Sequence, residues 1–145
     1  MASIVDDLKA VWLFEDLSQR QLKRLAKSFM ERTFRPGTAM VQQGKMSGVN
    51  FFVILDGEAA VLVDGNEVGK LGAGDHFGEL GLIAHQPRAA TVQATTPLRC
   101  LTIASWDFQR FVKDNPDMAW KLLQHLARAL MDEASTGPHA FRARP

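Results

Sequence analysis

The sequence is poor in cysteine, in long apolar runs and in net charge. Its single cysteine, Cys100, cannot form a disulfide within the chain. The stretch around it, LRCLTIA, alternates like a strand and therefore favours a packed thiol over a nucleophile. The N-terminus, MASIVDDLKA, carries acids where a signal peptide needs a basic start, and no segment approaches the length of a membrane span. We therefore expect a cytoplasmic protein without a membrane segment.

The balance of residue types excludes several further classes of protein. A formal net charge of +1 gives no large field to attract nucleic acid or membrane lipid. Hydrophobic residues make up 46% of the chain and charged residues 23%, which excludes a chain that is disordered throughout. A length of 145 residues suits one domain with a core of its own. We expect a single domain over 1–145, with N-terminal helices over about 3–31, strands over about 33–104, C-terminal helices over about 105–134 and a flexible tail over 135–145.

A helix is predicted in LSQRQLKRLAKSF. Ser18 and Gln21 have the spacing of a capping box, and Leu17 with Leu22 has that of a hydrophobic staple. The apolar positions are spaced to form one stripe on this helix: Leu22, Leu25, Ala26 and Phe29.

The middle of the chain has short β-type runs separated by turn residues, a pattern typical of an antiparallel barrel or sandwich. Asp56-Gly57 and Asp64-Gly65 predict two consecutive hairpins, because Asp-Gly pairs supply the positive φ angles of tight turns. Two more strands are expected on either side of Pro97.

The pattern then returns to helix. Ser105 can cap a short helix, and Asn115 with Pro116 predicts the start of a longer one. The expected apolar stripe of the longer helix is spaced for a barrel face or a partner helix: Ala119, Leu122, Leu123, Leu126, Ala127 and Leu130.

One stretch, FGELGLIAHQPRAAT, carries the chemistry of a binding site. A short helix beginning near Gly78 would offer free backbone N–H groups to an anion. Arg88 adds a permanently charged fork that suits two oxygens of one phosphate. Glu79 accepts hydrogen bonds only, and the neutral donor that accompanies a phosphate in a nucleotide is a ribose hydroxyl. A nucleotide with a single phosphate is indicated, because the stretch has no second base and no GK[ST] sequence.

The same residues allow three other interpretations: surface charges, a dinucleotide-binding loop and a metal site. An isolated Glu or Arg is usually a surface charge, and Glu79 and Arg88 could simply pair with each other. The GAGDHFG stretch lacks the glycine spacing of a dinucleotide loop. A metal site matches no recognised ligand spacing and would need Asp75, His76, Glu79 and His85. No pattern indicates an enzyme, a metal or a cofactor.

The ordered combination resembles the cyclic nucleotide-binding domains of protein kinase A regulatory subunits, nucleotide-gated channels and the bacterial catabolite activator protein. FGELGLIAHQPRAATV follows the phosphate-binding cassette of that family, and the likeness extends through VQQG, FFVILDGEAAVLV, LGAGDHFGE and NPDMAWKLLQHLARAL, so it covers about Leu8 to Leu130. The resemblance implies an α+β fold that is mainly β: an antiparallel, jelly-roll-like β-roll with an N-terminal helix, a short cassette helix and C-terminal helices.

The resemblance also implies roles for individual residues. Arg88 would bind the cyclic phosphate and Glu79 the ribose 2′-hydroxyl, while backbone amides near Gly78, Leu80 and Ala89 complete the cradle. Three residues would be apolar walls around the sugar and base, unless they are ordinary core: Val61, Val68 and Leu71. Members that prefer cyclic GMP often have threonine where this chain has Ala89, so cyclic AMP is favoured and cyclic GMP remains open.

The residue that contacts the base is expected near the end of the long helix. Glu133 is the candidate acceptor, with Asp132 next, although both could simply be solvated acids. Trp120 or Phe141 could instead stack on the base, and Trp120 also suits core or dimer packing.

These features favour a cyclic AMP-responsive regulatory module that signals to a protein partner or a second copy through its C-terminal helix. No DNA-binding domain is expected, since the residues after the long helix include only Arg142 and Arg144 as bases. The alternative is an interaction or dimerisation module of the same fold without a physiological nucleotide.

Overall fold

The computed structural model describes residues 4–45, 50–84 and 87–136, without the side chains at positions 79, 80 and 133–136. The chain divides into two compact units, a helical unit of 1–28 with 107–145 and a strand unit of 29–106. The expectation that 1–145 is a single domain stays a prediction.

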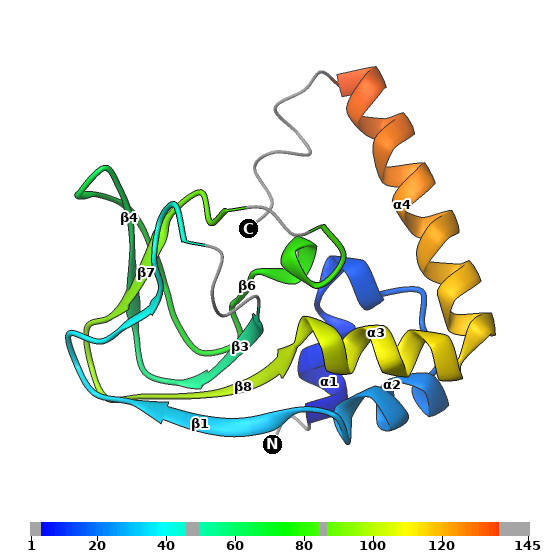
Figure 1. Cartoon of the computed structure of the whole chain (residues 1–145), viewed down its shortest axis with the longest axis horizontal. Coiled ribbons are helices and arrows are strands. Elements are labelled where there is room, and N and C mark those ends of the chain that lie inside the picture. Colours follow the sequence, from blue (N-terminus) through cyan, green and yellow to red (C-terminus); the bar gives the residue numbers. More distant parts are fainter. Residues whose placement is uncertain (1–3, 46–49, 85–86, 137–145) are drawn as a thin grey trace. The chain divides into compact units, whose positions relative to one another are not determined.

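The strand unit consists of two antiparallel sheets. Its described strands are β1 (Met30–Phe34), β2 (Ala39–Val41), β3 (Asn50–Asp56), β4 (Ala59–Val63), β5 (Asn66–Leu71), β6 (His76–Phe77), β7 (Thr91–Ala94) and β8 (Leu98–Ala104). One sheet has the order β1-β8-β3-β6 and the other β2-β7-β4-β5 (Figure 1). The predicted antiparallel β-roll with flanking helices is confirmed. In the part of the chain that is described, the two sheets do not join into a closed barrel.

The hairpin predicted at Asp64-Gly65 is confirmed. β4 pairs antiparallel with β5, and Val63 lies opposite Asn66 at the end of the ladder. Both turn residues have positive φ, 52° for Asp64 and 82° for Gly65, as a two-residue turn of the mirror-image type requires.

The hairpin predicted at Asp56-Gly57 is wrong, because β3 and β4 belong to different sheets. β3 is already paired with β8 and β6, so both of its edges are occupied. The turn instead packs against the segment before β8: a Cβ at Gly57 would lie 2.4 Å from the carbonyl oxygen of Pro97. The amide of Glu58 donates to the Thr96 hydroxyl at 2.9 Å. The Asp-Gly pair marks a tight turn, and the chain beyond it passes to the second sheet.

Apolar side chains from both sheets form the core of the strand unit. The buried cluster contains Val41, Phe52, Ile54, Ala59, Phe77, Val92, Ala94, Leu98 and Cys100. The rings of Phe52 and Phe77 stack at 4.8 Å, and burying each such ring contributes about 2–3 kcal/mol. Burial also raises the pKa of the Cys100 thiol to about 11, so the thiol is neutral at physiological pH. This agrees with the packed thiol predicted from the sequence.

The helical unit begins with α1 (Ile4–Lys9), the 3₁₀ helix η1 (Trp12–Phe14) and α2 (Gln19–Ala26). The capping box is confirmed, because Ser18 accepts from the Gln21 amide and the Gln21 side chain accepts from the Ser18 amide. Leu17, Leu22 and Leu25 are buried. The helix ends at Ala26 and β1 begins at Met30. Phe29 therefore lies outside the helix, and its predicted place in the apolar stripe is wrong.

The unit continues after the strands with α3 (Ser105–Asp114), which begins at the end of the strand unit, and α4 (Pro116–Thr136). Asn115 precedes α4 as predicted, and its carbonyl accepts from the Met118 and Ala119 amides. Its side chain bonds to other segments: Nδ2 donates to the Phe111 carbonyl, and Oδ1 accepts from Arg24.

The stripe predicted for the long helix is correct in part. Leu122 is buried together with Met118 and His125, and Ala119 and Leu126 are partly buried. Leu123 and Leu130 are each 58% exposed. Two faces of this helix therefore carry apolar residues, and the described residues cover one of them.

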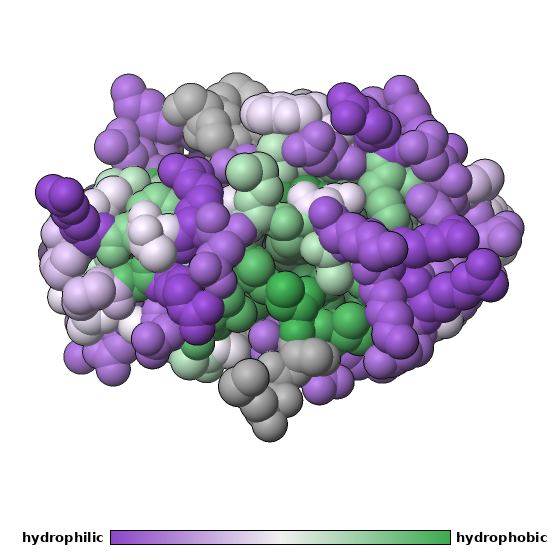
Figure 2. All heavy atoms as spheres, turned by 90° about the horizontal axis from the view of Figure 1, so that it is seen from below, coloured by the Kyte–Doolittle hydropathy of each residue, from purple (hydrophilic) through white to green (hydrophobic). Residues whose placement is uncertain are grey.

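Large apolar side chains are also exposed elsewhere, among them Met30, Val68, Ile83 and Trp106. Figure 2 shows one face of the molecule, where hydrophobic residues are visible between hydrophilic ones. None of the helices among residues 4–45, 50–84 and 87–136 has both the length and the apolar character that a membrane crossing needs.

Candidate functional site

Arg88 lies in the strand unit with its guanidinium turned toward the protein. Its Nη2 atom donates to the carbonyl oxygen of Asn50, the first residue of β3, at 2.6 Å. The residue is half-buried, and burial lowers the pKa of its guanidinium from the ordinary value. Arginine nevertheless stays protonated in proteins, so the strand unit holds a partly desolvated permanent cation. Such a cation interacts more strongly with an anion than a fully solvated one does.

Two glycines make room for this guanidinium. A Cβ at Gly78 would lie 2.7 Å from Arg88 Nη1 and 2.7 Å from the Asn50 carbonyl oxygen. Gly78 also has a φ of 89°, a conformation that other residues rarely adopt. A Cβ at Gly81 would meet Nη1 at the milder distance of 3.4 Å. Gly78 and Gly81 therefore lie directly against the predicted phosphate-binding arginine.

The backbone of Arg88 is held by the loop that follows β2. The Gly44 amide donates to the Arg88 carbonyl at 2.8 Å, and the Arg88 amide donates to the Lys45 carbonyl at 3.2 Å. The Gln43 amide donates to the Thr91 hydroxyl at 2.9 Å. The QQG tripeptide is part of the stretch that resembles the family, but nothing local to it predicts these hydrogen bonds to residues more than 40 positions away.

The short cassette helix is present as the 3₁₀ helix η2 (Glu79–Leu82), just after Gly78 as predicted. The Gly81 amide donates to the Gly78 carbonyl at 3.0 Å. Four residues align few peptide dipoles, so individual N–H groups and the guanidinium have to supply most of the attraction for an anion. The side chains of Glu79 and Leu80 lie outside the described part, and their roles stay predictions, as does the role of the exposed Ala89.

The three predicted apolar walls differ in their surroundings. Val61 and Leu71 are partly buried and pack against the core cluster of the strand unit. Val68 is 62% exposed. The ladder shifts between Val61, opposite Gly69, and Leu62, opposite Glu67, so Val68 is the extra residue of a β-bulge. Val61 and Leu71 thus serve at least as core, and Val68 is left accessible to a ligand.

The candidates for the base contact come from residues 120–141, and their roles stay predictions. The Glu133 side chain and the whole of Phe141 lie outside the described residues. Asp132 is exposed in the helical unit. Trp120 is 62% exposed on α4, which contradicts the interpretation of Trp120 as a core residue.

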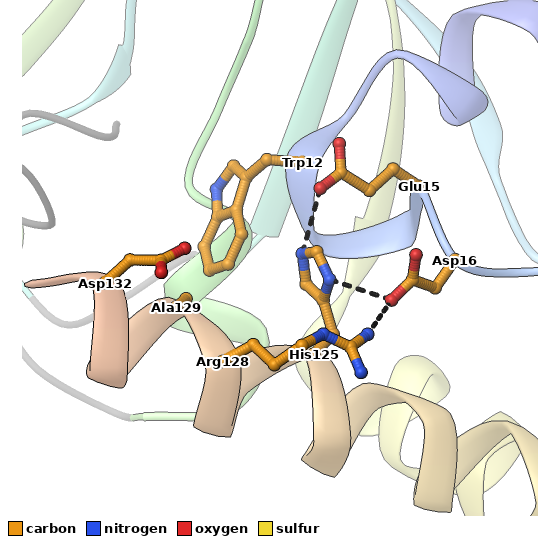
Figure 3. A pocket seen from close by; sticks show the side chains of 7 residues that line it. All are labelled: Trp12, Glu15, Asp16, His125, Arg128, Ala129 and Asp132. Atoms are coloured by element: carbon orange, nitrogen blue, oxygen red, sulfur yellow. Dashed lines mark hydrogen bonds and ion pairs between the residues drawn. The ribbon is translucent and has the colours of Figure 1, made fainter.

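A second polar cluster occurs in the helical unit, between η1 with the turn after it and α4 (Figure 3). It surrounds a cavity of about 180 Å³ lined by Trp12, Glu15, Asp16, His125, Arg128, Ala129 and Asp132. His125 is 8% exposed, and its two ring nitrogens face two carboxylates: Nδ1 lies 3.2 Å from Asp16 and Nε2 lies 3.5 Å from Glu15. Its ring also lies 5.5 Å from that of Trp12.

Asp16 is the centre of this cluster, because Arg128 also donates to it. Burial raises the pKa of the Asp16 carboxyl, but the hydrogen bonds and charges of His125 and Arg128 outweigh burial and leave it below its ordinary value. The cluster was not predicted from the sequence, because His125 lies more than 100 positions after Glu15 and Asp16 and no local pattern links them. The polar groups satisfy one another, so we interpret the cluster as a clamp between η1 and α4.

The described residues contain no group of three or more His, Cys, Asp or Glu side chains arranged to hold a metal ion. His85, which the metal interpretation would need, lies outside the described residues. The chemistry that the strand unit can offer is attraction of an anion to the half-buried guanidinium of Arg88.

That chemistry and that fold define a ligand-binding β-roll, and comparison with known proteins gives its family. The sequence model of the cyclic nucleotide-binding domain matches residues 31–115. The chain belongs to the cyclic nucleotide-binding domain family.

Individual relatives agree with this assignment. The chain is 36% identical over 107 residues to a cAMP-dependent protein kinase regulatory subunit of Yarrowia lipolytica, covering 72% of this chain and 28% of that protein. It is 32% identical over 139 residues to a cGMP-dependent protein kinase of Eimeria tenella, covering 95% of this chain and 13% of that protein. The N-terminal domain of a transcriptional regulator from Streptomyces coelicolor superposes with a TM-score of 0.79 at 30% identity, covering 88% of this chain and 94% of that structure. The chain thus spans only 28% of the length of the Yarrowia lipolytica regulatory subunit and 13% of that of the Eimeria tenella kinase.

Proposed function

We propose that this protein binds cyclic AMP at the Arg88 site and acts as a ligand-responsive regulatory module. The observation that carries the proposal is the half-buried Arg88 guanidinium, which is held by the Asn50 carbonyl and bordered by Gly78. A cyclic phosphate has one negative charge and two free oxygens, which suits a forked donor without a metal ion. The site is a binding site and no catalysis is proposed for it.

The remaining contacts follow from the family resemblance. Glu79 would accept from the ribose 2′-hydroxyl, and backbone amides near Gly78, Leu80 and Ala89 would complete the phosphate cradle. A carboxylate beside the phosphate favours a ligand with a free sugar hydroxyl. Ala89 offers no hydroxyl to a guanine amino group, which supports cyclic AMP over cyclic GMP. The names of the relatives point to both nucleotides, so the preference needs a direct test.

Binding would be transmitted through the C-terminal helix to a protein partner or a second copy of the chain. α4 supports such a role, because it exposes Trp120, Leu123 and Leu130 while its opposite face is buried. Transmission requires two conformations of α4, and the ligand shifts the equilibrium between them only if it binds one conformation more tightly than the other. We propose that this module acts in the cytoplasm.

Isothermal titration tests the proposal, with cyclic AMP, cyclic GMP and 5′-AMP as ligands. Arg88→Ala removes about two charge-assisted hydrogen bonds and should weaken cyclic AMP binding by roughly 100-fold or more. Arg35→Ala, at an exposed arginine of the same unit, is the matched control and should leave the affinity unchanged. The weaker binding of 5′-AMP would show that the cyclic phosphate is recognised. Equal affinities of wild type and Arg88→Ala would refute the phosphate role.

The competing function is an interaction or dimerisation module without a physiological nucleotide. The exposed apolar face of α4 is the observation that supports it. No binding of any nucleotide, together with self-association that ignores cyclic AMP, would favour this alternative.

A further inference from the structure

Both polar atoms of the Gln43 side chain form hydrogen bonds with one residue, Asp64, in the turn between β4 and β5. Its Oε1 accepts from the Asp64 amide at 2.8 Å, and its Nε2 donates to the Asp64 carboxylate at 3.0 Å. A donor and an acceptor on one planar group are needed for this pair of bonds, and glutamine supplies both. Gln42 beside it is exposed, so the two neighbouring glutamines differ in their surroundings.

The turn that Gln43 holds is conformationally unusual. Asp64 is at the tip of the β4–β5 hairpin and has a φ of 52°, the one positive value among non-glycine residues in the described ranges. Aspartate tolerates this left-handed region better than most residues, yet the conformation still has to be maintained by its surroundings. The hydrogen bond from the Asp64 amide to Gln43 does this directly.

The main chain at Gln43 leads to the nucleotide site within two residues. Its own amide donates to Thr91, the first residue of β7. The next two residues, Gly44 and Lys45, exchange backbone hydrogen bonds with Arg88. The hairpin tip is therefore connected to the backbone of the predicted phosphate-binding residue by the hydrogen bonds of Gln43, the main chain of residues 43–45 and the hydrogen bonds of Gly44 and Lys45.

We propose that Gln43 is a positioning residue for nucleotide binding: its two bonds to Asp64 fix the loop over residues 43–45, and that loop fixes the backbone of Arg88. This inference rests on the proposed function of Arg88. Gln43 need not touch the ligand. It sets the site in its binding geometry before the ligand arrives, and pre-organised groups lose less conformational freedom on binding.

The experiment compares Gln43→Ala with Gln42→Ala, the same substitution one residue away. For Gln43→Ala we expect cyclic AMP affinity to fall about tenfold, mainly through faster dissociation, because one neutral hydrogen bond and one hydrogen bond to the Asp64 carboxylate are lost. Gln42→Ala should stay within about twofold of wild type, because no bond to Asp64 is removed. Hydrogen exchange should show less protection of the Gly44 and Arg88 amides in Gln43→Ala, with the urea midpoint for global unfolding unchanged.

A pair of variants tests the hydrogen bonds themselves. In Gln43→Glu one carboxylate oxygen can still accept from the Asp64 amide, but the other replaces the donor and faces the Asp64 carboxylate. This repulsion should weaken binding about as much as Gln43→Ala does. Adding Asp64→Asn to Gln43→Glu restores a donor opposite an acceptor and should recover most of the affinity and of the amide protection. Asn also tolerates the positive φ at this position.

The two proposals fail differently. If the wild-type protein binds no nucleotide, the proposed function is lost, and hydrogen exchange alone then decides whether Gln43 fixes the Arg88 backbone. If wild type binds but Gln43→Ala binds equally well with unchanged exchange at Gly44 and Arg88, the positioning role is wrong while the Arg88 site stands. Equal weakening by Gln42→Ala and Gln43→Ala, or a lower urea midpoint as the only effect of Gln43→Ala, would also overturn it.

Discussion

Single residues of the strand unit set the shape of the candidate anion site around Arg88. The guanidinium of Arg88 occupies the space where a Cβ of residue 78 would lie, and the Asn50 carbonyl borders the same space. A flexible side chain could move aside, but a backbone carbonyl in a paired strand cannot do so cheaply. The absence of a side chain at Gly78 is therefore a requirement of the site.

Replacing Gly78 with Ala should damage the site more than replacing Gly81 does. An alanine at a φ of 89° is strained, and its Cβ would collide with the Asn50 carbonyl at 2.7 Å. We expect Gly78→Ala to lower the free energy of unfolding by about 2 kcal/mol or more and to weaken nucleotide binding. Urea unfolding and titration calorimetry measure the two effects.

Gly81→Ala is the matched control, because its Cβ would meet Arg88 Nη1 at 3.4 Å and its φ is not positive. We expect a change of less than about 1 kcal/mol in unfolding there. Equal losses in the two variants would contradict the geometric argument.

At the scale of elements, the clamp between η1 and α4 connects segments that are more than 100 residues apart. Asp16 joins two basic residues of α4, His125 and Arg128. The Asp16 carboxyl has a folded-state pKa below its ordinary value of 3.8. Its ionised form is therefore favoured by folding, so its stabilising effect is present above about pH 4 and is lost as the pH falls below that.

Asp16→Asn should destabilise the protein at neutral pH by no more than about 1 kcal/mol, because the pair is partly exposed. The difference in free energy of unfolding between wild type and this variant should shrink toward zero between about pH 4 and pH 2. Urea unfolding at a series of pH values measures it.

Asp107→Asn is the control, since the Asp107 side chain has the same 41% exposure but lies 4.0 Å from its arginine partner. Because Asp107 lies in the first turn of α3, where the helix dipole favours a carboxylate, we expect that change to cost about 0.3 kcal/mol, less than Asp16→Asn does. A difference for Asp16→Asn that persists undiminished to pH 2 would show that its carboxylate charge is not what stabilises the clamp.

At the scale of the whole molecule, the exposed face of α4 bears on assembly. Trp120, Leu123, Ala127 and Leu130 recur at intervals of three and four residues, which is the spacing of a seam between two helices. Trp120, Leu123 and Leu130 are all more than half exposed in the single chain. Burial of these side chains against a second surface would remove apolar area from water.

We expect the sedimentation mass to rise with concentration toward twice the monomer mass of 16.1 kDa. Leu123→Glu should abolish this rise, while Gln124→Glu, at a neighbouring exposed polar position, should preserve it. Repeating the measurement with saturating cyclic AMP shows whether assembly responds to ligand. A monomer at all concentrations would indicate that the face serves a different protein partner or none.

The parts of this structure that the sequence predicted correctly depend on neighbours in the chain. The capping box at Ser18 spans three residues, and the turn at Asp64-Gly65 needs only the φ preferences of two. The cassette around Arg88 is likewise one continuous stretch, which is why its helix and its small residues were found. The burial of Cys100 followed from the alternation of its own strand.

The parts that were wrong or missed depend on residues far apart in the sequence. Asp56-Gly57 turns as predicted, but β8 and β6 already occupy the edges of β3, so the chain passes to the other sheet. The face that α4 buries, the carbonyl that holds Arg88, and the bonds of Gln43 were likewise set by long-range packing. Local patterns determined where most of the elements form and which continuous stretch is the candidate binding site. Only the tertiary structure decided which surfaces meet, because that choice depends on space and hydrogen-bond partners supplied by distant segments.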